Sequence, residues 1–370
     1  MHNRPILITA GGTGGHVYPG LAVARALEKQ GIPVVWMGTS KGLEARVIPA
    51  AGIDMAWLEV TGLRGKGALA LILAPFRLMK ALYQSLRIMQ KHKPAAVLGM
   101  GGFVAGPGGL VAALMGIPVV IHEQNAIPGL TNRLLSKFSK KVLEGFPGSF
   151  AGAKEKAVQV GNPVREDISA LPAASVRMEN CKDRKLHLLI IGGSLGAQAL
   201  NEVVPQALAE LPEASRPLVR HQAGRDKDDA TKNNYQQVNV NADISAFIED
   251  MAEAYGWADL VICRSGALTV AELSSAGLAS ILVPYPYAVD DHQTANGLFL
   301  SEQGAAILLP QTELSAGALA TNLNALLAEP ERLVQMGEKA RQLAKPDATA
   351  HVAAIVADLA NYTFNTEVAA

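Results

Sequence analysis

The chain has 370 residues, of which 49% are hydrophobic and 18% charged, with 35 glycines and two cysteines. This length is too great for one ordinary core and indicates two domains, and the composition excludes a disordered chain and a disulfide-stabilised scaffold. The net charge is zero, yet residues 1–165 hold 19 Lys and Arg against 7 Asp and Glu, and residues 166–370 hold 14 against 26. The basic first half is therefore expected to meet a phosphate ligand or a membrane surface, or simply to attract the acidic second half.

Short apolar strands alternate with helical segments along the whole chain, which predicts an α/β fold built from parallel βαβ units. The predicted strands of the first half are residues 6–10, 34–37, 96–99, 119–122 and 141–143. Those of the second half are residues 188–191, 218–222, 260–263 and 280–284. A boundary is expected near 161–165, giving Rossmann-like domains at 1–163 and 164–345. A last helix is expected at 349–359, and the tail 346–370 is a candidate to pack back on the first domain.

Both halves begin with a strand that runs into a glycine-rich turn. Residues 11–20 (GGTGGHVYPG) form the first turn and residues 192–197 (GGSLGA) the second. Glycines allow several backbone N–H groups to converge on an anion, and the start of a helix adds a partial positive charge. A third such turn, 99–109, follows a further strand, and we expect a ligand in a cleft at these strand ends. Pro19 is expected in the first turn of the helix after the first loop.

Two residues are candidates for a catalytic base. His16 would lie beside a helix N-terminus, whose partial charge disfavours the imidazolium form, so a neutral ring is available to accept a proton from a sugar hydroxyl. Alternatively, the ring only braces the loop. Glu123, within His122–Asn125 (HEQN), is the second candidate, with neighbouring amides available to sugar hydroxyls. This segment lacks the second histidine of a zinc-binding HExxH site, so no metal ligand is expected there.

In the second half, residues 263–272 (CRSGALTVAE) are expected to end a strand and open a helix. The N–H groups of this turn would meet a diphosphate, with Arg264 and Ser265 close by. Glu272 lies far enough along the helix to hold two ribose hydroxyls, or alternatively forms a helix cap with Thr269. Further on, two amide side chains three residues apart are expected to share one helix face, those of Gln293 and Asn296.

Residues 61–93 carry seven Lys and Arg and no acidic residue. On a helix from Pro75, basic residues such as Arg77, Lys80 and Arg87 fall on one stripe, and apolar residues cover the rest. This pattern is typical of a helix lying in an anionic lipid surface, and equally of a helix packed on the sheet with a solvated basic edge. No apolar run reaches the roughly twenty residues that a membrane span needs. The two cysteines are expected as free thiols and the chain enters its first strand at once, which favours the cytoplasm.

The motifs GGTGGHVYPGLAVA, GMGGFVAGP, HEQNAIPGLTN, VGNPVR, GGSLGA, CRSGALTVAE and DHQTAN occur in the order of one family, and from about Ile6 to Asn296 the chain resembles the MurG family. The resemblance implies a GT-B fold with two domains that face a cleft. It implies inverting transfer of N-acetylglucosamine (GlcNAc) from UDP-GlcNAc to undecaprenyl-pyrophosphoryl-MurNAc-pentapeptide (lipid I), which gives lipid II for peptidoglycan. It also implies no metal or other cofactor, no nucleic-acid partner, and peripheral attachment to the cytoplasmic face of the inner membrane.

The resemblance carries residue roles as well. His16 and Glu123 would be catalytic, and Gly102, Phe103 and Asn132 would contact the acceptor. Phe103 stands where an aromatic residue such as tyrosine is common in the family, so the ring is kept and a hydroxyl is lost. The residues implied at the donor are Thr13, Gly14, Gly15, Asn125, Arg165, Ser194, Ile248, Arg264, Ser265, Ala267, Leu268, Thr269, Val270, Ala271, Glu272, Gln293 and Asn296.

Three other functions fit the same twin-domain pattern. A UDP-GlcNAc 2-epimerase would use the nucleotide sugar without a lipid acceptor, and so gives no reason for the basic segment. A transferase with another lipid acceptor would differ only in its second substrate. A nucleotide-sugar sensor without catalysis would need no base, so that changing His16 would have no effect on any assay.

Overall fold

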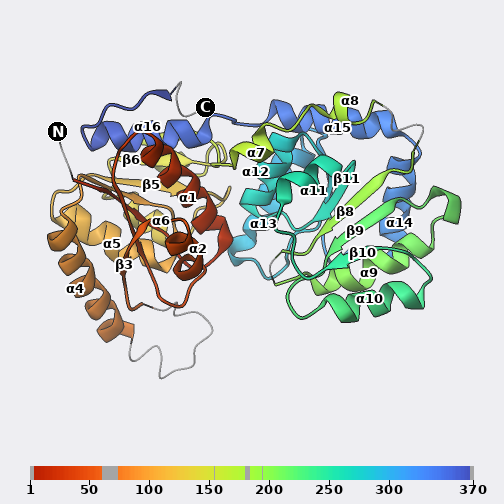
Figure 1. Ribbon diagram of the computed structural model, residues 1–370, viewed down its shortest axis with the longest axis horizontal. Helices are drawn as coiled ribbons and strands as arrows, with labels where there is room; N and C mark the ends of the chain where they lie inside the picture. The colour runs from red at the N-terminus through yellow and green to blue at the C-terminus, as the bar shows by residue number, and fades with distance from the viewer. Residues whose placement is uncertain (1–3, 61–73, 154, 180–183, 194, 367–370) are drawn as a thin grey trace. The chain divides into compact units, whose positions relative to one another are not determined.

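The computed structural model describes residues 4–60, 74–153, 155–179, 184–193 and 195–366. These residues form two compact units. Unit 1 comprises the described residues of 1–165 and 345–370, and unit 2 comprises those of 166–344. Each unit is an α/β fold around one parallel sheet (Figure 1), so the predicted fold class is confirmed.

The sheet of unit 1 has the strand order β3-β2-β1-β4-β5-β6-β7, and every pairing is parallel. Its strands are β1 Ile6–Thr9, β2 Val34–Gly38, β3 Asp54–Trp57, β4 Ala96–Gly99, β5 Val119–Glu123, β6 Lys141–Glu144 and β7 Ala157–Gln159. The helices are α1 Gly14–Lys29, α2 Glu44–Ala50, α4 Ala74–His92, α5 Gly102–Leu114, α6 Leu130–Leu135 and α16 Ala348–Leu359, with a 3₁₀ turn at η1 Ala151–Ala153.

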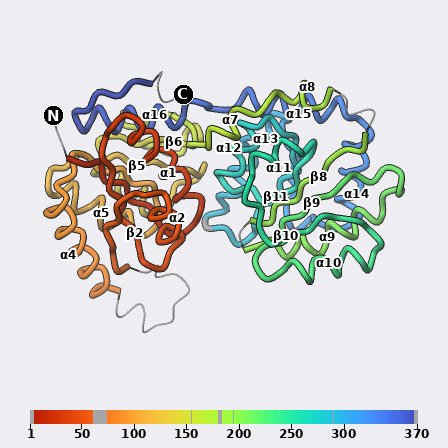
Figure 2. The backbone as a smooth tube through the Cα atoms, in the orientation of Figure 1, coloured from red at the N-terminus to blue at the C-terminus, as the bar shows by residue number. Residues whose placement is uncertain are grey.

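Helix α16 brings the end of the chain back to unit 1. It packs against α1, so the blue and red ends of the backbone lie side by side in Figure 2. Val352 and Val356 of α16 are fully buried in the same apolar cluster as Ile6 and Ile8 of β1. Leu7, between those two strand residues, belongs to a cluster on the other face of the sheet, because side chains alternate along a strand. The sheet of unit 1 is therefore buried on both faces, as parallel sheets are.

Unit 2 has the strand order β10-β9-β8-β11-β12-β13, again with parallel pairings throughout. Its strands are β8 His187–Ile191, β9 Leu218–Gln222, β10 Asp243–Ser245, β11 Leu260–Cys263, β12 Ala279–Leu282 and β13 Ala306–Leu308. The helices are α7 Glu166–Ser169, α8 Ala174–Arg177, α9 Gln198–Ala209, α10 Asp228–Gln237, α11 Met251–Trp257, α12 Ala267–Ala276, α13 His292–Ser301, α14 Ala316–Leu327 and α15 Pro330–Gln342, with 3₁₀ turns at η3 Glu213–Ser215 and η4 Val289–Asp291.

The predicted strands all occur, and their ends lie at the predicted residues or within two residues of them. The strands that the sequence did not predict are β3, β7, β10 and β13, and each is an edge strand of its sheet. Edge strands pair on one side only and need less continuous apolar sequence, so their signal is weak. Asp54–Trp57 in β3, for example, has two exposed residues out of four.

Helix α4 confirms the helix predicted from Pro75, beginning one residue earlier. Its inner side buries Ala81, Ser85 and Met89, whereas the outer side leaves Phe76 and Met79 more than 60% exposed. The remainder of the basic segment, residues 61–73 with Arg64 and Lys66, lies outside the described residues. Among the described helices, none is both long enough and apolar enough to cross a membrane.

Candidate functional site

The first glycine-rich turn connects β1 to α1. The helix begins at Gly14, with Thr13 at the capping position, so His16 lies in its first turn. The prediction that Pro19 would be in the first turn is wrong, because Gly14 and Gly15 already adopt helical conformation and Pro19 lies inside the helix. The helix therefore starts close to the strand end and presents His16 there, half-buried.

A buried carboxylate holds this turn from beneath. Glu44, at the start of α2, is fully buried and accepts a hydrogen bond from the Gly12 N–H through Oε2 (3.0 Å). Its other oxygen accepts from both the N–H (2.9 Å) and the hydroxyl (2.7 Å) of Thr39. A Cβ at Gly11 would lie 2.6 Å from Glu44 Oε1, so only glycine leaves room for the carboxylate. The carboxylate of Glu44 therefore binds the N–H of Gly12, a group that the glycine-rich pattern predicted would bind a ligand.

The third glycine-rich turn lies against the first. A Cβ at Gly102 would be 2.6 Å from the carbonyl oxygen of Gly11, and Gly102 has a φ of +76°, so both the space and the conformation require glycine. Gly101 has a φ of +96°, and a Cβ there would lie 2.9 Å from Nδ1 of His16. The ring of Phe103 approaches Gly12. The structure therefore brings together three predicted residues, His16, Gly102 and Phe103.

The HEQN segment ends strand β5 beside His16. Gln124 Oε1 lies 2.8 Å from His16 Nδ1, and the other end of the same amide lies 3.0 Å from His122 Nδ1. His122 is fully buried, and this burial lowers the pKa of its imidazole to about 4. Gln124 itself is 1% exposed. The amide is thus engaged with two histidines inside unit 1.

The carboxylate of Glu123 is buried and accepts four hydrogen bonds. Oε1 accepts from the N–H and the side-chain amide of Asn125 (3.0 and 3.1 Å), and Oε2 accepts from the Gly129 N–H (3.1 Å) and the Asn132 side chain (3.0 Å). These bonds fold the loop between β5 and α6. The structure therefore joins three predicted residues, Glu123, Asn125 and Asn132, in one internal network.

In unit 2, the predicted strand-to-helix turn is present between β11 and α12. The strand ends at Cys263, which is buried, and the helix begins at Ala267 with Gly266 at the capping position. Ser265 is fully buried, and its hydroxyl has no hydrogen-bond partner among the described residues. Along α12, Val270 is buried while Leu268, Thr269 and Ala271 are partly exposed.

Glu272 lies in the second turn of α12 and is partly exposed. Tyr255 of α11 donates a hydrogen bond from its hydroxyl to Glu272 Oε2 (3.0 Å). The alternative in which Glu272 and Thr269 form a helix cap is wrong, because Gly266 occupies the capping position and both residues lie inside the helix. Tyr255 is 1% exposed, so its hydroxyl fixes one oxygen of the carboxylate from the protein side.

Three further predicted residues surround this turn. Arg264 donates to the carbonyls of Val283 and Pro284 (3.1 Å each), and burial lowers the pKa of its guanidinium. Asn296 is fully buried and donates to the Ser265 carbonyl (3.2 Å). Gln293 accepts from the N–H of Tyr285 (2.9 Å). Arg264 and Gln293 thus both stabilise the backbone after β12.

The second glycine-rich turn, after β8, is held by a neutral amide. The Gly193 N–H donates to Gln222 Oε1 (3.2 Å), and a Cβ at Gly196 would clash with the carbonyl oxygen of Ala223 at 2.0 Å. Ser194, which the resemblance places at the donor, lies outside the described residues. Ile248 follows β10 in a partly exposed loop, and Arg165 ends the first of the two segments that form unit 1.

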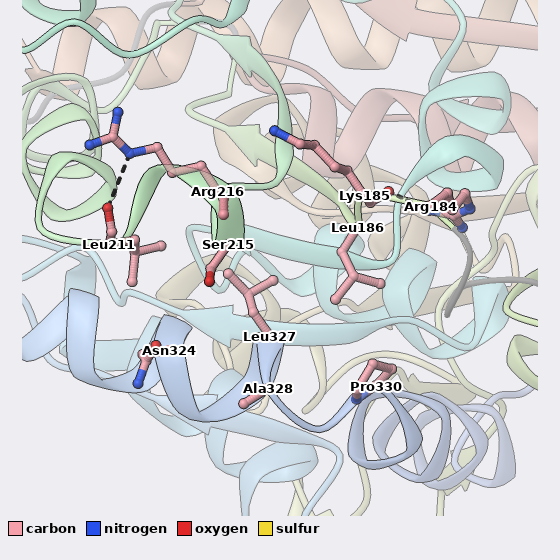
Figure 3. A pocket seen from close by; sticks show the side chains of 11 residues that line it. Arg184, Lys185, Leu186, Leu211, Ser215, Arg216, Asn324, Leu327, Ala328 and Pro330 are labelled. Carbon is pink, nitrogen blue, oxygen red and sulfur yellow. Dashed lines mark hydrogen bonds between the residues drawn. The ribbon is translucent and has the colours of Figure 1, made fainter.

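A surface pocket of about 470 Å³ lies at the opposite, amino-terminal edge of the unit 2 sheet. Its lining residues precede β8 and β9 and surround the start of α15, and Figure 3 shows Arg216 bonded to the Leu211 carbonyl on one side of it. None of the predicted site residues lines this pocket. We therefore place the candidate site at the carboxyl ends of the strands and not here.

Sequence reasoning missed Glu44, Tyr255 and the bonding of Gln124. Glu44 begins α2 after a loop that lacks the run of glycines seen after β1 and β4, and Tyr255 lies 17 residues before its partner. Gln124 follows Glu123, which was predicted. The HEQN motif did predict a role for its amides, but that role was binding sugar hydroxyls and not bonding to His16 and His122. The sequence around Glu44, residues 38–46 (GTSKGLEAR), does not mark this acid as buried, because its burial depends on tertiary packing.

Two parallel-sheet units with glycine-rich turns at their strand ends are the architecture of the GT-B class of glycosyltransferases. The N-terminal domain of glycosyltransferase family 28 matches residues 6–144, and the C-terminal domain of that family matches residues 187–352. The chain belongs to this family, and within it to the MurG family.

Individual relatives agree over nearly the whole chain. A UDP-N-acetylglucosamine–N-acetylmuramyl-(pentapeptide) pyrophosphoryl-undecaprenol N-acetylglucosamine transferase of Alkalilimnicola ehrlichii is 55% identical over 351 residues, covering 95% of this chain and 98% of its own. The crystal structure of Acinetobacter baumannii MurG has a TM-score of 0.80 at 42% identity, covering 96% of this chain and 99% of that one. A UDP-GlcNAc 2-epimerase from Neisseria meningitidis has a TM-score of 0.65 at 14% identity, covering 94% and 98%, and so shares the fold alone.

Proposed function

We propose that this enzyme transfers GlcNAc from UDP-GlcNAc to the 4-hydroxyl of the MurNAc sugar in lipid I, which gives lipid II and UDP. The observation that carries the proposal is the 55% identity, over 95% of the chain, with the Alkalilimnicola ehrlichii transferase, whose name describes this reaction. The site geometry supports it. Half-buried His16 lies at the carboxyl end of β1, and the turn before α12, of a kind that can bind a diphosphate, lies at the carboxyl end of β11.

The reaction is an in-line displacement. The MurNAc oxygen bonds to the anomeric carbon of GlcNAc from the face opposite UDP, the bond from that carbon to the diphosphate oxygen breaks, and the configuration inverts. The hydroxyl proton passes to a base on the protein, and the electron pair of the broken bond leaves with UDP. The protein must therefore supply a base and stabilise the negative charge that develops on the diphosphate.

His16 is the base in this proposal, and Glu123 is not. The carboxylate of Glu123 already accepts four hydrogen bonds from loop donors, so a further proton would have to displace one of them. His16 uses one ring nitrogen for Gln124 and is only half-buried. We therefore assign proton removal to His16 and the shaping of the acceptor loop to Glu123.

Unit 2 binds the donor. The start of α12 offers backbone N–H groups to the diphosphate, next to the buried Ser265, whose hydroxyl has no hydrogen-bond partner within the described part of the chain. Glu272 holds the ribose hydroxyls, with Tyr255 orienting its carboxylate. Arg165 supplies positive charge to the departing UDP, whereas Arg264 stabilises the surrounding loop through its carbonyl contacts. No metal ion is needed in this scheme, since helix termini and cationic side chains carry the charge.

Unit 1 associates with the cytoplasmic face of the inner membrane in this proposal. Large apolar side chains are more than 50% exposed on α4, α5 and α6, which pack side by side: Phe76, Leu78, Met79, Tyr83, Leu114, Leu130 and Leu134. The helix α4 adds Lys80 and Arg87 on exposed positions. Exposed apolar and basic side chains on neighbouring helices are what an anionic lipid surface attracts. Reversing the charges of Arg77, Lys80 and Arg87 should weaken sedimentation with anionic vesicles and leave UDP affinity unchanged.

Product analysis tests the proposal. The enzyme is incubated with UDP-GlcNAc and a lipid I analogue in excess EDTA, and a lipid II analogue and UDP are expected in equal amounts. UDP-GlcNAc alone serves as the second arm. The manno epimer of the nucleotide sugar in that arm would establish an epimerase, and activity that returns only with added Mg²⁺ would refute the metal-free scheme.

A further inference from the structure

The side chain of His16 ends a hydrogen-bonded chain that begins at the backbone of Gly161. The carbonyl oxygen of Gly161 lies 2.9 Å from His122 Nε2, His122 Nδ1 lies 3.0 Å from Gln124 Nε2, and Gln124 Oε1 lies 2.8 Å from His16 Nδ1. An imidazole can carry its hydrogen on either nitrogen and an amide can face either way, so the hydrogens must be placed from the chemistry of the partners.

The carbonyl of Gly161 fixes the whole arrangement. A carbonyl oxygen can only accept, so His122 Nε2 must carry a hydrogen. His122 is fully buried, which lowers its pKa to about 4, so its ring is neutral near pH 7 and Nδ1 holds a lone pair. Gln124 must therefore turn its NH₂ group toward His122. Its oxygen then faces His16, and since an amide oxygen only accepts, His16 Nδ1 must donate.

We infer that Gln124 and His122 are positioning residues that hold His16 as its Nδ1–H tautomer and so leave the lone pair on Nε2 free to take the proton of the acceptor hydroxyl. This inference rests on the proposed function, in which His16 is the base. No proton moves along the chain: His16 receives the hydroxyl proton on Nε2, and its Nδ1–H stays bonded to Gln124 throughout. The part that Gln124 plays resembles that of the residue that orients the histidine in a catalytic triad.

The surroundings keep the chain rigid. The backbone carbonyl of Gln124 accepts from the side chain of Asn162 (2.9 Å), and that of His122 accepts from Asn132 (3.0 Å). Gly101 lies so close to the His16 ring that a Cβ would be 2.9 Å from both Nδ1 and Cε1. The ring is therefore confined on one side by backbone while Gln124 fixes its angle.

Two variants of equal side-chain length separate this role from a merely structural one. Gln124→Met removes the hydrogen bonds of the amide to both histidines, whereas Gln124→Glu keeps an acceptor for His16 and loses the donor to His122. Gln303→Met, at an exposed position in unit 2, is the matched control. The tautomer is read from ¹H–¹⁵N spectra of enzyme labelled at its eight histidines, with His16 assigned by comparison with His16→Ala.

We expect His16 of the wild type, and of Gln124→Glu, to carry its hydrogen on Nδ1. Gln124→Met should show a mixture of tautomers and a kcat lower by about 10–100-fold, by analogy with the loss of a residue that orients a metal-binding histidine, with unchanged affinity for UDP. A wild-type His16 with hydrogen on Nε2 would overturn the inference, as would a Gln124→Met enzyme with unchanged tautomer and kcat. If Gln124→Met does not fold, the wild-type spectrum alone decides. The spectrum does not depend on turnover, so an enzyme that makes no lipid II refutes the proposed function and leaves the tautomer to be judged separately.

Discussion

The two glycine-rich turns share a sequence pattern but differ in what lies beneath them. In unit 1 the N–H of Gly12 is bonded to the carboxylate of Glu44, which is fully buried. In unit 2 the N–H of Gly193 is bonded to the neutral amide of Gln222, which is 3% exposed. A carboxylate under a loop repels a second anion, whereas an amide does not. We therefore propose that the same pattern serves two purposes, with the first turn as a scaffold for His16 and the second turn suited to the donor diphosphate.

The first way to test this difference is to remove His16. His16→Ala should lower kcat by about 10²–10⁴-fold, the usual contribution of a general base, because no other group takes the hydroxyl proton. UDP affinity, measured by calorimetry, should stay unchanged because the donor binds unit 2. His351→Ala, an exposed histidine of unit 1, is the control. Loss of UDP binding in His16→Ala would place the diphosphate on the first turn instead.

The second test exchanges the groups beneath the turns. Gln222→Glu puts a negative charge under the second turn and should weaken UDP binding by about 10–100-fold, as expected for an unscreened like charge near a diphosphate. Glu44→Gln removes a charge under the first turn and should leave UDP affinity unchanged while lowering the stability of unit 1. Equal effects of the two variants on the UDP dissociation constant would remove the distinction between the turns.

The third test uses the buried histidine of each unit. Burial lowers the pKa of His122 to about 4 and that of His221 to about 3. An unfolded histidine binds a proton near pH 6.5, so between that pH and the lowered value the unfolded state holds more protons. Within this range the free energy of unfolding should therefore fall on acidification by about 1.4 kcal/mol per pH unit for each histidine. Above pH 7 neither histidine should affect it.

Unfolding curves from pH 7 to pH 5 measure this slope. His221→Gln should reduce the slope for unit 2 and leave that of unit 1 as it was, because Tyr235 and Asn201, the partners of His221 among the described residues, belong to its own unit. A slope that is identical in the variant would mean that His221 is charged in the folded protein.

The smallest expected effect concerns the donor side. Tyr255→Phe removes the hydrogen bond to Glu272 Oε2 and should raise KM for UDP-GlcNAc by about 2–10-fold, the value of one hydrogen bond to a carboxylate that partly reorients, with little change in kcat. Tyr83→Phe, on exposed α4, is the matched control. An unchanged KM would remove Tyr255 from the positioning of Glu272.

The sequence was sufficient for the centre of each sheet but not for its edges. Strands such as Ala96–Gly99 and Leu260–Cys263 are continuous apolar segments, buried on both faces, and their ends were predicted to the residue. The edge strand Asp243–Ser245 has no such pattern, since it pairs on one side only. The start of α1 was predicted too late in the chain. Gly14 and Gly15 were assigned to the turn, and Pro19 was expected in the first turn of the helix.

Within the site, single residues could be predicted and their partners could not. His16, Glu123 and Glu272 are polar residues next to strand ends, a position visible in the sequence. The bonds of Gln124 to His16 and of Glu44 to Gly12 join residues 108 and 32 positions apart, and they depend on the packing of α1, α2 and β5 around one strand end. Such bonds arise from tertiary structure and leave no local pattern.

The most direct measurement is a crystal structure of the enzyme with UDP bound. The account predicts the diphosphate against the start of α12 and beside the glycine-rich turn after β8, with the ribose hydroxyls at Glu272 and the first turn still bonded to Glu44. A nucleotide seated on Gly12–Gly15, with Glu44 displaced from the Gly12 N–H, would contradict it.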